Sequence, residues 1–131
     1  VEWDMDGALA GAASFIAVER HVGHLKMATT DVGYPLVQFG KDLTETKGII
    51  GTGGVFAFGR NSRAVLSTCL YQDRNPYSLR PKHPDFLVDK DYILYAGGLL
   101  STVYPEKALR LVKSSLRPVE AASGSPVTGN G

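Results

Sequence analysis

The feature that most constrains the fold is a cluster of glycines between two apolar runs. Residues 49–56 read Ile-Ile-Gly-Thr-Gly-Gly-Val-Phe, with glycine at Gly51, Gly53 and Gly54. Glycine accepts positive φ and lets another group approach the backbone closely, so the pattern predicts a buried strand, a tight turn and a new helix. The first amides of such a helix can face an anionic or polar ligand, for example a nucleotide. Two interpretations stay open: a turn that needs glycine only for its shape, and a ligand site.

Length and composition restrict the class of protein. The chain has 131 residues, 44% hydrophobic and 21% charged, with a formal net charge of +1. These values are typical of one soluble globular domain with a real core. The charge gives no reason to expect a nucleic-acid partner. No apolar run approaches the roughly 20 residues of a membrane span, so we expect no membrane segment. The single cysteine, Cys69, fits a cytoplasmic location, and the start at Val1 predicts a piece of a longer protein.

Hydrophobic periodicity and turn signals predict alternating helices and strands. The predicted helices, with their candidate N-caps, cover residues 4–22 (Asp4 or Asp6), 63–71 (Asn61 or Ser62), 92–103 (Asp89 or Asp91) and 106–116. The predicted strands cover residues 25–29 and 34–39, which form a hairpin, and residues 47–50 and 86–88. This order predicts an α/β layer structure with helices packed on a small mixed sheet. A ligand would then lie beyond the carboxyl ends of the strands, where the glycine turn is.

Small and apolar residues indicate how the helices pack. The first helix carries one face of residues at a spacing of three and four: Leu9, Ala12, Ala13, Ile16 and Ala17. Two adjacent glycines, Gly97 and Gly98, lie inside a later predicted helix, where each costs about 1 kcal/mol relative to alanine. That cost predicts a close helix contact, and the small residues of the first helix are the expected partner.

Three other groups are weaker candidates for function. His21 and His24 could share a metal ion, or could complement the dipole at the end of the first helix. Cys69 lies among apolar residues, which favours a packing role over a nucleophile. A basic loop is either solvated or contacts a phosphate or a partner; its residues are Arg74, Arg80, Lys82 and His83.

Several motifs, taken in order, resemble one protein family. They are residues 17–23 (Ala-Val-Glu-Arg-His-Val-Gly), 38–44 (Gln-Phe-Gly-Lys-Asp-Leu-Thr), 50–55 (Ile-Gly-Thr-Gly-Gly-Val), 86–94 (Phe-Leu-Val-Asp-Lys-Asp-Tyr-Ile-Leu), 98–100 (Gly-Leu-Leu) and 104–106 (Tyr-Pro-Glu). Over roughly residues 8–116 the chain resembles the C-terminal part of the MutL family associated with glutamate mutase and related adenosylcobalamin-dependent aminomutases. That family is unrelated to the mismatch-repair protein of the same name.

The resemblance implies a fold and a ligand. The family is similar to actin-like ATPases, which have two lobes of ribonuclease-H-like fold with ATP in the cleft between them. Residues 1–117 would be a C-terminal lobe, and residues 118–131, rich in Ser, Gly and Pro, are expected to be a disordered tail. The residues implied to contact ATP or ADP are Gly51, Thr52, Gly53, Gly54 and Val55. Asp91, followed by Gly97 and Gly98, would lie at the far edge of the adenosine pocket.

The sequence departs from a complete enzyme of that type. It has no N-terminal phosphate loop and no Asp-rich strand for Mg²⁺, and Asp4 and Asp6 look like helix caps. The Mg²⁺ ligands are therefore expected from the chain's own missing N-terminal lobe, no residue here is assigned a catalytic role, and the chain alone should hydrolyse ATP poorly. The implied partner is an adenosylcobalamin-dependent mutase, which the ATPase would reactivate like a chaperone. The alternative is a non-enzymatic interaction domain whose glycine turn is purely structural.

Overall fold

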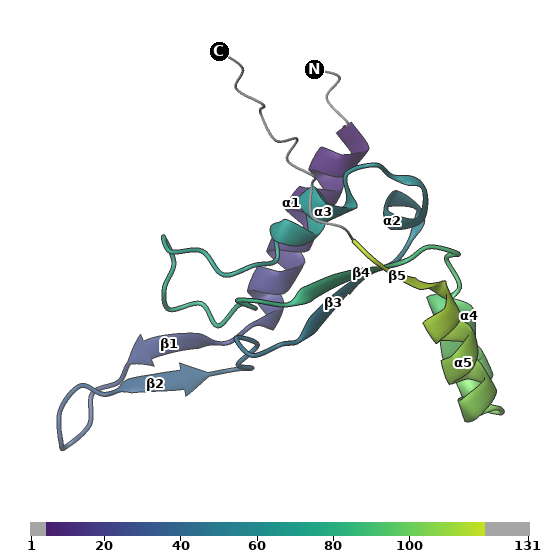
Figure 1. The fold of residues 1–131 in the computed structure, drawn as a ribbon. Coiled ribbons are helices and arrows are strands. Elements are labelled where there is room, and N and C mark those ends of the chain that lie inside the picture. Colours follow the sequence, from purple (N-terminus) through teal and green to yellow (C-terminus); the bar gives the residue numbers. More distant parts are fainter. Residues whose placement is uncertain (1–4, 120–131) are drawn as a thin grey trace, which may run out of the picture.

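The computed structural model describes residues 5–119 as a mixed α/β chain (Figure 1). Its elements are α1 (Met5–His21), β1 (His24–Met27), β2 (Leu36–Phe39), β3 (Gly48–Gly51), α2 (Gly54–Phe58), α3 (Ser62–Ser67), β4 (Asp85–Asp89), α4 (Leu94–Ser101), α5 (Pro105–Ser115) and β5 (Leu116–Pro118). The predicted α/β class and the order of helices and strands are confirmed. Among the helices between residues 5 and 119, none combines the length and apolar character that a bilayer crossing needs.

The larger sheet has three strands in the order β3-β4-β5. β3 runs parallel to β4 with Gly51 opposite Val88, and β5 runs antiparallel to β4 with Leu116 opposite Asp89. Because β3 and β4 are parallel, their carboxyl ends meet at one edge of the sheet. The chain after Gly51 therefore lies beside Asp89, which positions the glycine turn next to the start of the β4–α4 connection.

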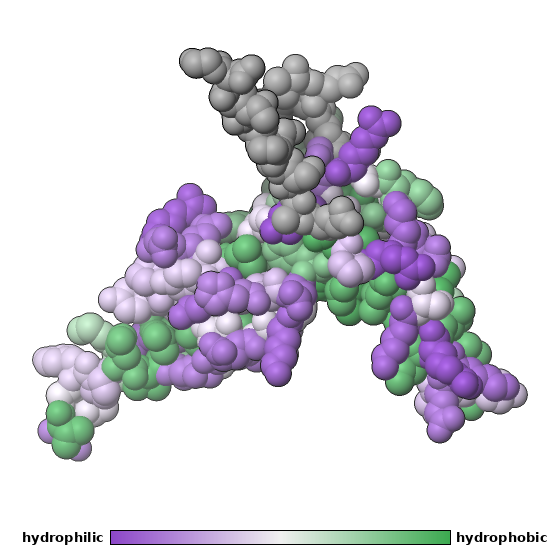
Figure 2. Space-filling view, in the orientation of Figure 1, coloured by the Kyte–Doolittle hydropathy of each residue, from purple (hydrophilic) through white to green (hydrophobic). Residues whose placement is uncertain are grey.

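The smaller sheet is the predicted hairpin of β1 and β2, which extends away from the larger sheet (Figure 1). Gly33 has φ 127° in the turn, a conformation that glycine adopts without strain. Figure 2 shows green, apolar surface on this hairpin at the lower left. The exposed apolar residues there are Met27, Val32, Tyr34, Leu36 and Phe39. An apolar hairpin with two solvated faces is a candidate contact surface.

The core lies between α3 and the larger sheet. Leu66 of α3 packs against Phe86 and Val88 of β4, with Ile49 and Phe56 at its margin. Side chains alternate between the two faces of a strand, so Asp89 points to the opposite face from Val88. On that opposite face Asp89 meets Ser115, the last residue of α5. The sheet is thus apolar on its α3 side and carries a buried polar contact on its α5 side.

The face of α1 that packs on the rest of the molecule is not the apolar face that the sequence predicted. All five residues of the predicted apolar face of α1 are exposed, including the large side chains of Leu9 and Ile16. Gly11 is buried instead, and its carbonyl accepts a hydrogen bond of 3.1 Å from Thr68 Oγ1. The orientation of α1 is decided by its close approach to α3 and by the hydrogen bond to the turn after α3. As a result, no described part of the chain covers the apolar stripe of α1.

Of the two glycines in α4 only Gly97 makes a close helix contact, and it packs on α5 and not on α1, which corrects the prediction. A Cβ at Gly97 would collide with Cγ2 of Val112, whereas a Cβ at Gly98 would meet nothing within 4 Å. α4 and α5 follow each other closely in the chain and pack as an antiparallel pair (Figure 1). The short connection at residues 102–104 favours packing of α4 on α5, so the contact of Gly97 is made with its neighbour in the chain.

The chain is ordered beyond the predicted boundary at residue 117. Leu116 leaves the helix with φ −72° and ψ 129°, and residues 116–118 form β5. Val119 N donates to Phe86 O over 2.8 Å. Pro118 and Val119 therefore belong to the sheet rather than to a tail, because β4 offers an edge with which this extended segment can pair. The rest of the predicted tail, residues 120–131, lies outside the described residues.

Candidate functional site

The glycine turn forms as predicted between β3 and α2. Gly53 is the N-cap residue of α2, with φ 101° and ψ 172°, and its carbonyl accepts hydrogen bonds from Phe56 N at 3.1 Å and Ala57 N at 2.9 Å. The amides of Gly54 and Val55 are the first in the helix, where no intrahelical acceptor exists for them. Thr52, Gly54 and Val55 are exposed. The turn therefore presents backbone donors at the surface of the molecule.

The three glycines of the turn have three different surroundings. A Cβ at Gly51 would collide with the ring of Phe56, so packing inside the chain excludes a side chain there. Gly53 has a backbone conformation that other residues adopt only with strain. A Cβ at Gly54 would meet only Phe58 Cδ2, at 3.9 Å, which is an ordinary contact. Gly54 thus has neither a packing reason nor a backbone reason to lack a side chain.

Asp89 connects the glycine turn to the start of α4. Its carboxylate is fully buried at 0% exposure and accepts four hydrogen bonds. The donors are Ser115 Oγ at 2.5 Å and Ile93 N at 3.2 Å on Oδ1, and Thr52 Oγ1 at 2.9 Å and Leu94 N at 2.8 Å on Oδ2. Three segments of the chain, namely the glycine turn, the start of α4 and the end of α5, therefore converge on one side chain.

The same hydrogen bonds keep Asp89 ionised. Burial is the largest single influence and acts to raise the pKa of this carboxyl. The hydrogen bonds from Ser115, Leu94, Ile93 and Thr52 together outweigh it, and the pKa lies below its ordinary value. Because all four donors are committed to the charged form, Asp89 positions the turn and does not itself offer a free carboxylate to a ligand. The sequence named Asp89 only as a possible helix cap, a role that the bonds to Ile93 and Leu94 confirm.

Asp91, the acid predicted for the adenosine pocket, has a different environment. It is exposed, and its backbone N donates to Ser115 Oγ over 2.9 Å. Within residues 5–119 its carboxylate accepts no hydrogen bond. The next residue, Tyr92, has φ 52°, which is uncommon for a residue other than glycine. The Asp91 carboxylate therefore lies at the surface, two residues along the chain from Asp89, whose carboxylate holds the glycine turn.

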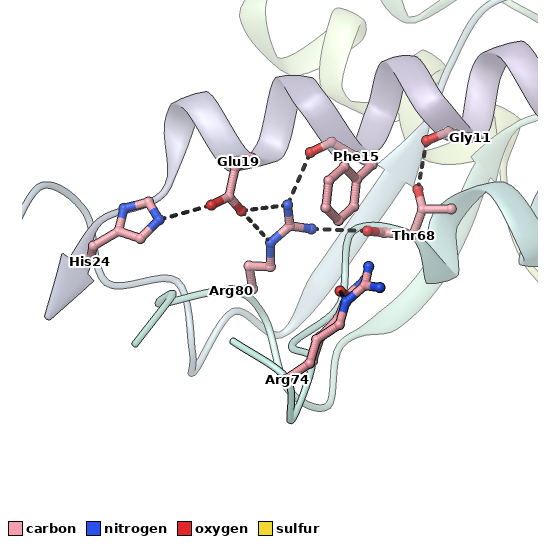
Figure 3. Close-up of polar contacts among 8 residues, drawn as sticks. Gly11, Phe15, Glu19, His24, Thr68, Arg74 and Arg80 are labelled. Atoms are coloured by element: carbon pink, nitrogen blue, oxygen red, sulfur yellow. Dashed lines mark hydrogen bonds and ion pairs between the residues drawn. The ribbon is translucent and has the colours of Figure 1, made fainter. Parts of the chain in front are cut away.

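A second polar cluster ties α1 to the loop of residues 72–84 (Figure 3). Arg80 donates to Glu19 Oε2 from Nε at 2.9 Å and from Nη2 at 2.7 Å. It also donates to the carbonyls of Thr68 and Phe15, both at 3.0 Å. Its guanidinium lies 4.3 Å from the centre of the Phe15 ring. Arginine suits this position because its planar fork serves a carboxylate, two carbonyls and an aromatic face at once.

This cluster corrects the prediction for the basic loop. Arg80 is only 2% exposed, while Arg74, Lys82 and His83 are exposed as a solvated loop requires. A hydrogen bond from His24 and the two from Arg80 hold the pKa of Glu19 below its ordinary value. The sequence carried no local signal for the pair, because Glu19 and Arg80 are far apart in the chain and meet only in the fold. Arg80 is a structural residue and not a free phosphate ligand.

The remaining candidates have structural surroundings. His24 Nε2 lies 3.0 Å from Glu19 Oε1, whereas His21 Nε2 lies 3.4 Å from Lys41 Nζ, so the two rings have different neighbours. Between residues 5 and 119 no group of three or more His, Cys, Asp or Glu could hold a metal ion. Cys69 is buried, as expected for a packing role, and burial raises the pKa of its thiol.

The fold and the turn define a class: an α/β domain that presents an open glycine turn at the carboxyl edge of its sheet, fixed there by a buried carboxylate. The family model described as MutL protein matches residues 1–116. The chain belongs to this family, as its motifs predicted. It is 40% identical over 115 residues to Protein MutL of Clostridium tetanomorphum, an alignment that covers 88% of this chain and 25% of that protein.

The extent of these matches bears on what can be transferred. The chain spans about a quarter of the length of the curated relative that it matches. No solved structure matches it significantly. The family is therefore established from sequence, while the activity of a whole protein of this family is a matter for proposal.

Proposed function

We propose that this chain is the nucleotide-binding C-terminal lobe of an actin-like ATPase with a ribonuclease-H-like fold. The observation that carries the proposal is the free space at Gly54. Nothing within the described chain requires glycine there, and the neighbouring residues Thr52 and Val55 are exposed. A ligand that approaches the backbone closely supplies the missing reason, and the first amides of a helix favour an anionic one.

In this proposal ATP or ADP lies against the backbone of residues 51–55. Thr52 is held by its bond to Asp89, which fixes the turn relative to the first amides of α4. Asp91 is exposed beside that helix start and is available to the ribose or base. The Mg²⁺ ligands and the water-activating groups come from the chain's own N-terminal lobe, which would close the opposite side of the cleft. The role of this chain is to bind and orient the nucleotide.

The proposed partner of the whole protein is an adenosylcobalamin-dependent mutase. The motifs of this chain resemble the MutL family associated with such mutases, and a cytoplasmic, chaperone-like ATPase that releases damaged cofactor is the corresponding function. Nucleotide-driven closure of two lobes is a general means of coupling ATP to work on a partner. In this arrangement the exposed apolar hairpin is available for contacts outside the nucleotide cleft.

A second candidate function is a non-enzymatic interaction domain. The apolar stripe of α1 and the apolar surface of the β1–β2 hairpin favour it, because exposed apolar groups of this extent commonly mark contact surfaces. In that case the glycine turn is needed only for the shape of the chain. The two candidates differ in one property, which is nucleotide affinity at the turn.

The test is the affinity of ATP and ADP for the full-length protein and for a Gly54→Val variant, measured by isothermal titration calorimetry. A valine at residue 54 has room in the fold but occupies the space next to the backbone, so both nucleotides should bind at least about tenfold more weakly. Gly48→Val is the matched control, because a Cβ there would meet only Asp85 O, at 3.8 Å, and Gly48 lies at the start of β3, at the opposite end of the strand from the turn.

The outcomes separate the two candidates. Loss of ATP and ADP affinity in Gly54→Val alone, with unchanged thermal unfolding, supports the nucleotide site. Normal affinity in a folded Gly54→Val protein rejects it and leaves the interaction domain. Absence of nucleotide binding by the unmodified full-length protein rejects it as well.

A further inference from the structure

A basic pocket lies on the α3 side of the sheet, away from the residues of the glycine turn proposed to bind nucleotide. It has a volume of about 750 Å³ and is bounded by the segment from Phe56 to Ser67 and by β4 and β5. Its lining includes four cationic side chains, Arg60, Arg63, Lys90 and Arg117. We call this the cationic pocket. Gly53 and Gly54 do not line it.

The fold brings these four charges together from three separate segments. Lys90 follows β4 on the face of Val88, because side chains alternate along a strand. Arg117 comes from β5, which pairs with β4 and lies opposite Val88. Arg60 and Arg63 come from the turn before α3 and from its first residues. The sequence alone does not show the cluster, because these positions are close only after the sheet has formed.

The charges in this pocket are not balanced by acids. The formal net charge of the whole chain is only +1, yet none of the described residues that line the pocket is acidic. Four like charges around one cavity repel each other, an effect that salt screens only partly. A bound anion removes that repulsion.

Each cation keeps donors for a ligand. Lys90 Nζ donates to Ala57 O at 2.7 Å and has two further protons. Arg117 uses Nη1 for the carbonyls of Ser114 and Leu116. Arg63 lies over the ring of Phe86, with its Cζ 5.5 Å from the ring centre. Arg60 makes no hydrogen bond or ion pair with any described residue. The side chains are thus partly positioned and still have free N–H groups.

The rest of the pocket defines the size and character of the ligand. Its volume lies in the range of small-molecule sites, and apolar groups of Phe56, Val88 and Val119 contribute to the lining. Arginine forks pair with phosphate oxygens through two parallel hydrogen bonds. Several arginines and a lysine around one space suit an anion with more than one charged group.

We propose that the cationic pocket is a second ligand site, specific for a diphosphate group that is either free or carried on an organic molecule. This site is separate from the glycine turn and does not depend on the nucleotide function proposed above. The diphosphate is held by Arg60, Arg63, Lys90 and Arg117, and an attached organic group lies against the apolar lining.

Sodium pyrophosphate is the probe, titrated into the 131-residue chain at low ionic strength by isothermal titration calorimetry. We expect saturable binding at one site, with an affinity that falls as salt is added. Arg60→Gln and Arg63→Gln should each weaken it about tenfold, the usual effect of losing one charge-assisted hydrogen bond. Arg110→Gln removes the same charge from exposed α5, outside the lining, and should leave the affinity unchanged.

Gly54→Val distinguishes this site from the glycine turn. Unchanged pyrophosphate binding in that variant supports the separate site. Loss of binding in Gly54→Val, with normal binding in Arg60→Gln, overturns it. Absence of pyrophosphate binding by the unmodified chain, or equal weakening by Arg110→Gln, also overturns it. Because Arg60 is exposed and makes no hydrogen bond or ion pair with a described residue, its replacement does not threaten the fold.

The source of the diphosphate is resolved by comparing pyrophosphate with ADP in the Gly54→Val background. Equal affinities that both depend on Arg60 show a site for the free anion. Tighter ADP binding with the same dependence shows that the apolar lining contacts an organic group. If ADP binding does not depend on Arg60, ADP binds at another place on the protein. In that case the proposal stands only if pyrophosphate binding still weakens when Arg60 is replaced.

Discussion

Single glycines in this chain serve distinct purposes that substitution can separate. Gly97 is buried where α4 meets α5, and a side chain there would collide with Val112, whereas Gly98 faces open space. Gly97→Leu should lower the free energy of unfolding by about 1–3 kcal/mol, the usual cost of overpacking. Gly98→Leu should change it little or raise it slightly, because leucine is the better helix former. Urea denaturation of both variants measures the difference, and equal midpoints would contradict the assigned packing.

The glycine turn gives a second residue-scale prediction. Gly53→Ala places a side chain at φ 101° and should cost about 1–3 kcal/mol of stability. Gly54→Ala has space and a helical position, and should be neutral or slightly stabilising. Thermal unfolding of the two variants provides the comparison. A destabilised Gly54→Ala would show that packing within the chain, and not a ligand, explains the glycine.

Elements are held together by two hydrogen-bonded acids, the buried Asp89 and the partly exposed Glu19, and each can be tested. Both oxygens of Asp89 accept from a backbone amide, Oδ1 from Ile93 and Oδ2 from Leu94. In Asp89→Asn the side-chain NH₂ group replaces one carboxylate oxygen. In either orientation it therefore faces a backbone N–H, which is also a donor, and that hydrogen bond is lost. We expect a loss of about 2–3 kcal/mol of stability. Ser115→Ala, which removes one donor and leaves the charge, should cost less. A stable Asp89→Asn protein would contradict the role of Asp89 as the connection between turn and helix.

The pair of Glu19 and Arg80 predicts a pH dependence. Hydrogen bonds from His24 and Arg80 lower the pKa of Glu19, so its contribution is complete above the ordinary carboxyl value of 4.5 and is lost as pH falls through the lowered value. Glu19→Gln should reduce stability at pH 7 by about 2 kcal/mol, a figure reduced from the fully buried case because Glu19 is partly exposed. The deficit should shrink below about pH 4. Glu45→Gln, an exposed change of the same charge, is the control, and an equal loss there would remove the special role of Glu19.

At the scale of the whole molecule, activity should require more than this chain. The buried hydrophobic residues are few, while large apolar side chains lie exposed on α1, the hairpin and α4. We expect the chain to fold but to release phosphate from Mg-ATP only at background rate, because phosphoryl transfer needs charge neutralisation around the phosphates. A phosphate-release assay beside the full-length protein tests this. Comparable turnover by the chain alone would reject the idea that it is half of a cleft.

Local signals were sufficient for the elements and for the turn. Alternation, capping and glycine clusters predicted the hairpin, the strand before Gly51 and the helices, since each depends on residues close together in the sequence. They also predicted Asp89 or Asp91 as the cap of the helix that follows β4, and Asp89 is the acid that accepts from its first amides. The predicted end of the last helix, at residue 116, lies one residue beyond the observed end at Ser115, but β5 was not predicted, because residues 116–118 pair with β4, which lies far earlier in the chain. Tertiary pairing overrides local propensity at such an edge.

The sequence by itself determined the family, the α/β class and the place of the glycine turn. Only the tertiary structure decided which face of α1 is buried, which helix Gly97 contacts, and that Arg80 lies inside the fold. The physical reason is the same in each case. Hydrogen bonds and close contacts between distant segments fix these arrangements, and a carboxylate such as Glu19 or Asp89 acquires its role only from donors that the fold brings to it.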